Sequence, residues 1–152
     1  MTSRWRKGEA EVERLIAEKS LERLSGAQAD GLPWLDKAHR TLTTAEGIGD
    51  GDPESAYVLA YDAARHACAG LLAQQGLRST SKGGHYAVEL AVRGQFADAF
   101  RPFGTLRRRR NELEYPSYPG ERIEPEEVQE ALSTAGDLVT NAGKLLGQLG
   151  LF

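Results

Sequence analysis

The chain has 152 residues, of which 40% are apolar and 27% are charged, and its formal net charge is −3. This length and apolar content suffice for one folded domain without disulfides or structural metals, and the single cysteine, Cys68, excludes an intramolecular disulfide. No stretch approaches the roughly 18 consecutive apolar residues that span a bilayer, and no apolar segment follows the charged start, as a secretory signal would require. We therefore expect a cytoplasmic protein of bacterial type that has no membrane segment.

Positive charge gathers in one part of the sequence. Residues 63–110 hold nine Lys and Arg against two acids, a net charge of +7, whereas residues 111–152 hold two bases against eight acids, a net charge of −6. This asymmetry indicates either a basic surface on an acidic body or two segments that pack together and neutralise each other.

Apolar residues recur at helical spacing through most of the chain, and the alternation typical of strands is absent. Asp52 and Pro53 fit the N-cap and the first turn of the clearest helix, and Gly76 fits its end. A break is expected at Pro102-Phe103-Gly104. The predicted helices cover residues 9–25, 34–47, 53–75, a short stretch from about residue 85, most of 96–115, and 124–148.

These elements predict an all-α fold, an antiparallel bundle of four to five main helices plus short helices. We expect residues 1–30 to form an N-terminal helical extension and residues 31–152 to form the bundle, as one compact domain overall. The apolar face of the last helix is suited either to the bundle core or to a dimer interface.

The arginine-rich segment that begins at Phe103 carries the most chemical information. In a continuous helix, Arg110 falls on the same face as three apolar residues, Phe103, Leu106 and Leu113. An arginine on such a face is costly unless it meets a carboxylate, a phosphate or an interface. The sequence leaves two interpretations open: Arg110 pairs with a buried acid and orders the bundle, or it binds a phosphate.

The neighbours of Arg110 divide into two groups. Arg107 and Asn111 border the apolar face and are candidates for the same phosphate, whereas Arg108 and Arg109 are predicted to point into solvent.

Four segments, in this order and spacing, resemble the HEPN family, the higher eukaryotes and prokaryotes nucleotide-binding domain, over about residues 34–146. They are the Ala/Tyr-rich helix that begins at Ser55, the stretch Leu71–Arg78, the helix start Lys82-Gly-Gly-His85, and Leu106-Arg-Arg-Arg-Arg-Asn-Glu-Leu-Glu-Tyr-Pro116.

The resemblance implies a function that involves RNA. Many proteins of this family are metal-independent endoribonucleases that carry an Arg, often followed by Asn, and a His four to six positions later. Their protomers pair across a cleft, where the Arg holds the scissile phosphate and the His assists attack by the 2′-hydroxyl. The resemblance places Arg110 and Asn111 at the first two positions, and Tyr115 stands where the His is expected. A tyrosine with its usual pKa of about 10 is a poor base at neutral pH, so the resemblance implies phosphate binding more directly than cleavage.

Histidines elsewhere in the chain are candidates to replace the missing one. His66 lies on the predicted polar side of its helix and is either a solvated residue or a histidine that reaches the cleft from another helix. The polar stretch Ser79–His85 is either an interhelical loop or a backbone anion site. The three histidines and Cys68 lack the spacing of metal ligands, so neither a metal nor another cofactor is expected.

Three functional hypotheses follow. The leading one is a homodimeric HEPN protein of toxin–antitoxin or defence type that binds RNA or nucleotide phosphate in its dimer cleft through Arg110, Asn111 and Tyr115. The first alternative is an active endoribonuclease toxin that uses Arg110 with Tyr115 or His66. The second is a non-catalytic helical partner of a nucleotidyltransferase antitoxin.

Overall fold

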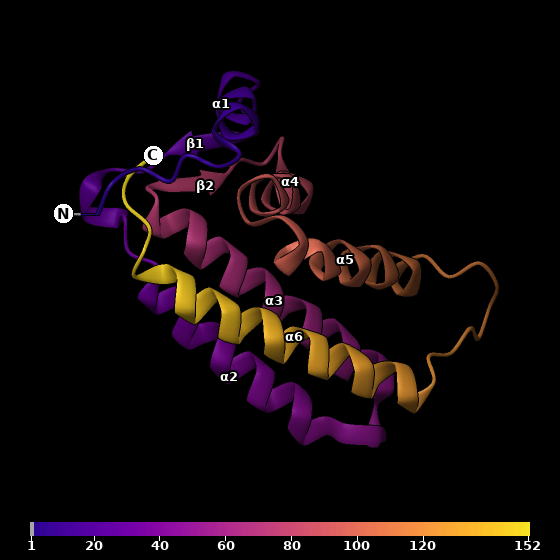
Figure 1. The fold of residues 1–152 in the computed structure, drawn as a ribbon. Helices are drawn as coiled ribbons and strands as arrows, with labels where there is room; N and C mark the ends of the chain where they lie inside the picture. Colours follow the sequence, from indigo (N-terminus) through magenta and orange to yellow (C-terminus); the bar gives the residue numbers. More distant parts are fainter. Residues whose placement is uncertain (1) are drawn as a thin grey trace.

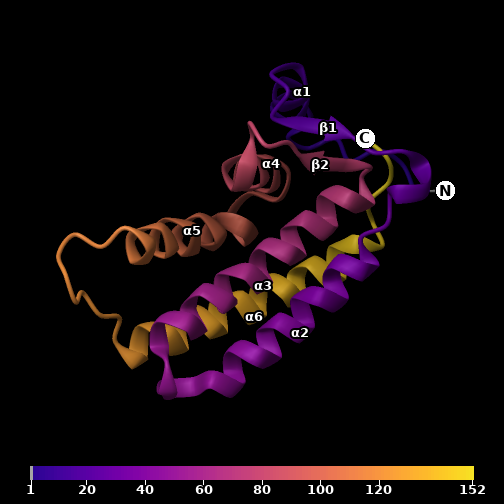
Figure 2. The same cartoon turned by 180° about the vertical axis from the view of Figure 1, so that it is seen from behind.

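The computed structural model describes residues 2–152, and helices make up most of it (Figures 1 and 2). Three long helices pack against one another as a bundle in which every pair is in contact: α2 (Leu32–Ile48), α3 (Pro53–Gln74) and α6 (Pro125–Leu146). α2 runs antiparallel to both of the others, whereas α3 and α6 run in the same direction because the intervening chain returns along α5. The all-helical fold class is confirmed. None of the helices in the described part of the chain is long and apolar enough to cross a membrane.

Two shorter helices cover one side of α3. These are α4 (Gly84–Phe96) and α5 (Arg101–Glu114), joined by the 3-10 turn Ala97–Phe100. The predicted break at Pro102 is displaced towards the N-terminus, because Ala97 turns the chain with a φ of 54°. Pro102 instead lies in the first turn of α5, where backbone N–H groups have no hydrogen-bond partner within the helix, so the N–H that proline lacks is not needed.

The predicted helix over residues 9–25 is wrong in its second half. Helix α1 (Glu9–Ala17) ends early because Lys19 adopts a φ of 64°, through which a right-handed helix cannot continue. Strand β1 (Leu21–Arg23) follows and pairs antiparallel with β2 (Leu77–Ser79), a segment that the sequence predicts to be the end of a helix and a loop. Strands of three residues are too short to show the alternation that identifies a strand in a sequence.

The ends of α3 lie close to where the sequence predicts them. The Asp52 carboxylate accepts a hydrogen bond from the Ser55 backbone N–H at 3.2 Å, which caps the helix. Beyond its last residue, Gly76 takes a left-handed φ of 73°.

A close approach between α2 and α3 fixes the start of α2. A Cβ added at Gly31 would collide with the carbonyl oxygen of Gly70, and one added at Gly70 would lie 3.0 Å from the Cβ of Trp34. The two glycines therefore let the first turn of α2 lie against the backbone of α3, and this contact holds the Trp34 ring over α3.

Candidate phosphate-binding site

Helix α5 is anchored on α3 by stacked aromatic rings. Phe103 and Tyr61 are fully buried, their ring centroids lie 5.6 Å apart, and their planes differ by only 3°. Leu106 and Leu113 are buried on the same face of α5. This packing turns Arg110 towards the bundle, and only 29% of its side chain is exposed.

The other three consecutive arginines of α5 differ in their surroundings. Arg107 donates from Nε to Oε2 of Glu89 at 3.1 Å, and the Glu89 side chain, on α4, is 1% exposed. Arg108 is exposed, as predicted. Arg109 is not: it is half-buried and donates from Nε to Oε1 of Glu127 on α6 at 2.6 Å. The prediction that Arg109 is solvated is therefore wrong, because α6 lies against that side of α5.

Arg110 has the weakest acidic partner of the four. Its Nη2 lies 3.8 Å from Oε2 of Glu114, beyond hydrogen-bonding distance, and its buried Nε has no hydrogen-bond partner among residues 2–152. The interpretation that Arg110 pairs with a buried acid is wrong, since the buried acid, Glu89, contacts Arg107 instead. A half-buried guanidinium whose nitrogen lacks an acceptor is suited to binding an anion.

A histidine of α4, His85, lies close enough to Arg110 for the charge of the guanidinium to act on it. The Nδ1 of His85 is hydrogen-bonded to the Tyr61 hydroxyl at 2.9 Å. Burial raises the pKa of Tyr61, so this hydroxyl keeps its proton at neutral pH. Partial burial and the nearby positive charges of Arg65 and Arg110 lower the pKa of His85. His85 is therefore a neutral ring at pH 7, held by Tyr61 among guanidinium groups.

Arg65 of α3 completes this group. Its Nε is buried without a hydrogen bond in the described chain and lies 3.6 Å from Oδ1 of Asp62. We define Arg65, His85, Arg107 and Arg110 as the Arg–His cluster. Three helices supply its members, and the buried Nε atoms of Arg65 and Arg110, both without a hydrogen bond among residues 2–152, come from α3 and α5.

His66 is buried rather than solvated, which corrects its expected place on a polar face. It is 6% exposed, and its ring centroid lies 5.9 Å from that of Trp34, which covers it. Burial, reinforced by the positive charges of Arg65 and Lys37, lowers the pKa of His66 to about 4. Its Nδ1 has no hydrogen-bond partner in the part of the chain that the structure describes.

Asn111 and Tyr115 lie at the outer end of α5. Both are exposed, and Tyr115, with 79% of its surface accessible, directly follows the last residue of the helix. The Tyr115 backbone N–H donates to the Asn111 carbonyl at 3.0 Å. Within one protomer, the position expected for a catalytic histidine thus faces solvent.

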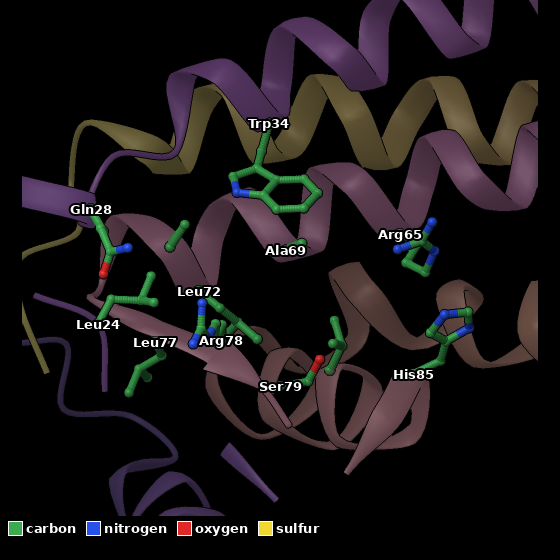
Figure 3. Close-up of a pocket in the computed structure, with 12 residues that line it drawn as sticks. Leu24, Gln28, Trp34, Arg65, Ala69, Leu72, Leu77, Arg78, Ser79 and His85 are labelled. Carbon is green, nitrogen blue, oxygen red and sulfur yellow. The ribbon is translucent and has the colours of Figure 1, made fainter. Parts of the chain in front are cut away.

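A cavity of about 340 Å³ opens beside the Arg–His cluster, between α2, α3, α4 and β2 (Figure 3). Trp34 forms one wall, and Arg65 and His85 lie together at one end. We call it the Trp34 cavity. Five of its apolar lining residues come from α3, β2 and α4, and these are Ala69, Leu72, Ala73, Leu77 and Val88. The cavity and the cluster therefore share two residues.

Sequence reasoning missed His85, Tyr61 and Arg65 as members of the site. His85 lies in the first turn of α4, as the sequence predicts, and Tyr61 is one of the buried residues of α3. What joins them to Arg110 is the docking of α4 and α5 on the same side of α3, which helical spacing does not encode.

Comparison with known proteins identifies the family. The family model of the HEPN domain matches residues 33–145. Neither the curated proteins nor the solved structures include a significant match to the chain. Residues 2–152 hold no group of three or more His, Cys, Asp or Glu side chains that could bind a metal ion. The family match covers the three long helices together with α4 and α5, and the chain therefore belongs to the HEPN domain family.

Proposed function

We propose that this chain binds RNA or nucleotide phosphate at the Arg–His cluster, as a homodimeric HEPN protein of toxin–antitoxin or defence type. The observation that carries the proposal is Arg110, whose buried Nε lacks an acceptor and whose nearest carboxylate lies 3.8 Å away. A phosphate oxygen would supply that acceptor, and a guanidinium can bind phosphate through two parallel hydrogen bonds.

The electrostatics of the cluster support an anionic ligand. Positive charges from Arg65 and Arg110 act together on the His85 ring and lower its pKa. A bound phosphate would offset those charges and raise the pKa of His85, so that the protonated ring could donate to a phosphate oxygen from Nε2 while Nδ1–H donates to Tyr61. Phosphate binding and protonation of His85 would then reinforce each other.

The dimer is a separate part of the proposal. Asn111 and Tyr115 are exposed at the end of α5, where a second copy could bring its own α5 to form a shared cleft around the phosphate. Light scattering at micromolar concentration tests the dimer. A monomeric result would contradict the shared cleft but would leave phosphate binding at the Arg–His cluster possible.

Replacement of Arg110 by alanine should weaken RNA binding about tenfold to a hundredfold, because a charge-assisted hydrogen bond is worth about 1.5–3 kcal/mol. The measurement is fluorescence anisotropy of a labelled single-stranded RNA at several salt concentrations, and the slope against salt should fall by about one. Arg101→Ala is the matched control, since Arg101 begins the same helix and its side chain is 70% exposed. Equal affinities for both variants and the wild type would contradict the proposal.

The charge of Arg110 acts on a histidine, His85, and this favours a second candidate function, metal-independent RNA cleavage. In that reaction the 2′-hydroxyl oxygen attacks the adjacent phosphorus in line, the bond to the 5′-oxygen breaks, and a 2′,3′-cyclic phosphate and a 5′-hydroxyl form. A neutral His85 with its proton on Nδ1 could take the 2′-hydroxyl proton at Nε2, and solvent would protonate the leaving oxygen. His85 would then replace the histidine that Tyr115 displaces.

If the chain cleaves RNA, His85→Asn should reduce the rate about 10²- to 10⁴-fold, the usual contribution of an acid–base group, which is a larger effect than its loss of RNA affinity as a member of the Arg–His cluster. Gel analysis for cyclic-phosphate ends measures this, with Tyr115→Phe and His66→Ala as comparison variants. A loss of cleavage with Tyr115→Phe but not with His85→Asn would indicate that Tyr115, and not His85, is the catalytic residue. A wild type that neither binds nor cuts RNA at low salt would favour the helical partner of a nucleotidyltransferase.

A further inference from the structure

We propose that the Trp34 cavity binds one base of a single-stranded RNA whose phosphate lies on the Arg–His cluster. The protein would then select unpaired RNA over duplex RNA. This inference rests on the proposed function, because it takes phosphate binding at the cluster as given, and it adds a second subsite with a different chemistry.

The size and lining of the cavity suit a flat aromatic ligand. Its volume of about 340 Å³ is at the low end of the range for small-molecule sites. Ala69 and Leu72 of α3 and Leu77 of β2 offer it apolar contacts. Duplex RNA could not enter, since its bases are stacked and their faces are covered, whereas an unpaired base presents a free aromatic face.

Trp34 supplies the stacking surface. Its side chain extends from the first turn of α2 over the cavity (Figure 3), and the residue remains 37% exposed although it is the largest aromatic type. Gly70 allows this position, because a Cβ there would lie 3.0 Å from the Cβ of Trp34. Stacking of a base on such a ring is tolerant of base identity. The Nζ of Lys37 lies over the Trp34 ring, 5.7 Å from its centroid, so a base that stacks on that face would displace this cation or stack beside it.

Polar groups at the two ends of the cavity orient the ligand. Arg65 and His85 lie at one end and belong to the Arg–His cluster, so a base in the cavity would have its phosphate beside these two side chains. Gln28 and Ser79 also line the cavity, and both side chains can hydrogen-bond to the edge of a base. One nucleotide has an aromatic base and an anionic phosphate, and these match the apolar cavity and the cationic end beside it.

The test compares the affinity of the intact chain for a short single-stranded RNA, for the same RNA in a duplex, and for an abasic strand of equal length. Wild type should bind the single strand at least tenfold more tightly than either of the others. Trp34→Ala should weaken single-strand binding about fivefold to a hundredfold, the range typical of one stacked base, and leave abasic binding unchanged. Trp34→Phe should retain most of the affinity, and Leu32→Ala, which alters an exposed side chain in the same turn, should retain all of it.

The outcomes separate the two proposals. If Arg110→Ala weakens binding but Trp34→Ala does not, or if wild type binds the abasic strand as tightly as the single strand, the base subsite is wrong and phosphate binding stands. If wild type binds none of the three at low salt, both proposals fail. The abasic comparison uses wild-type protein alone, so the proposal remains testable even if Trp34→Ala does not fold.

Discussion

Replacement of Glu89 by leucine is expected to lower the free energy of unfolding by about 3 kcal/mol. Glu89 is 1% exposed on α4, and its carboxylate accepts a hydrogen bond from Arg107 at 3.1 Å. It also lies 3.6 Å from Nη1 of Arg108. Leucine keeps much of the volume of the side chain but leaves the half-buried guanidinium of Arg107 without a counter-charge, which is the costly way to break an ion pair.

The Glu89 carboxylate also occupies a space on α5 that is open only because residue 104 is a glycine. A Cβ added at Gly104 of α5 would collide with Oε1 of Glu89. The pair between Glu89 and Arg107 therefore joins α4 to α5 at the point where both helices hold members of the Arg–His cluster.

A double-mutant cycle measures the pair. Arg107→Leu should cost a similar amount, and the double variant Glu89→Leu with Arg107→Leu should recover most of the loss, since replacing both partners by packed apolar residues is often nearly neutral. Urea denaturation gives the four free energies. Glu112→Gln is the control, because it removes an exposed acid that pairs with Arg109. Additive losses in the double variant would show that the pair contributes nothing beyond packing.

Burial of His66 should make the protein less stable in acid. Between pH 7 and pH 4, the free energy of unfolding of wild type should fall by up to about 3 kcal/mol more than that of the variant His66→Phe. Burial lowers the pKa of His66 to about 4 in the folded chain, against about 6.5 in an unfolded chain. Because the folded pKa is the lower one, the unfolded chain binds the extra proton first. The stability from the neutral ring is complete above pH 6.5, declines as pH falls, and is fully lost below pH 4.

Urea denaturation at intervals of half a pH unit gives the free energy of unfolding of wild type and of His66→Phe. The difference between the two free energies removes the contribution of the carboxylates, which both proteins share. Phenylalanine retains a ring of similar shape beneath Trp34, and His39→Gln, which replaces an exposed histidine of α2, is the matched control for the loss of a histidine. Parallel pH profiles for wild type and His66→Phe would mean that His66 titrates as it does in an unfolded chain.

Local patterns predicted most of the helical fold. The cap at Asp52, the stop at Gly76 and the long apolar face of α6 act within one element, so the sequence alone carries them. The same reasoning placed Arg110 on the apolar face of α5, where the structure finds it half-buried. The small sheet was missed because the paired strands are short and their partners lie far apart in the chain.

The composition of the site depended on tertiary structure. Helical spacing states which residues share a side of one helix, but it does not state which other helix lies against that side. For this reason the sequence could not show that Glu89 would pair with Arg107, or that Trp34 would cover His66.

By itself, the sequence predicted a helical chain, a resemblance to HEPN domains and an Arg110 that faces inward, and these are confirmed. That Tyr115 stands where the family's histidine is expected stays a prediction. Only the tertiary structure decided that His85, held by Tyr61, lies near Arg110 and Arg65 and beside a cavity. The physical reason is that the partners of a charged side chain depend on which other helices pack against it. Arg110 lacks a hydrogen-bonded acid because α4 and α6 place their acids against Arg107 and Arg109.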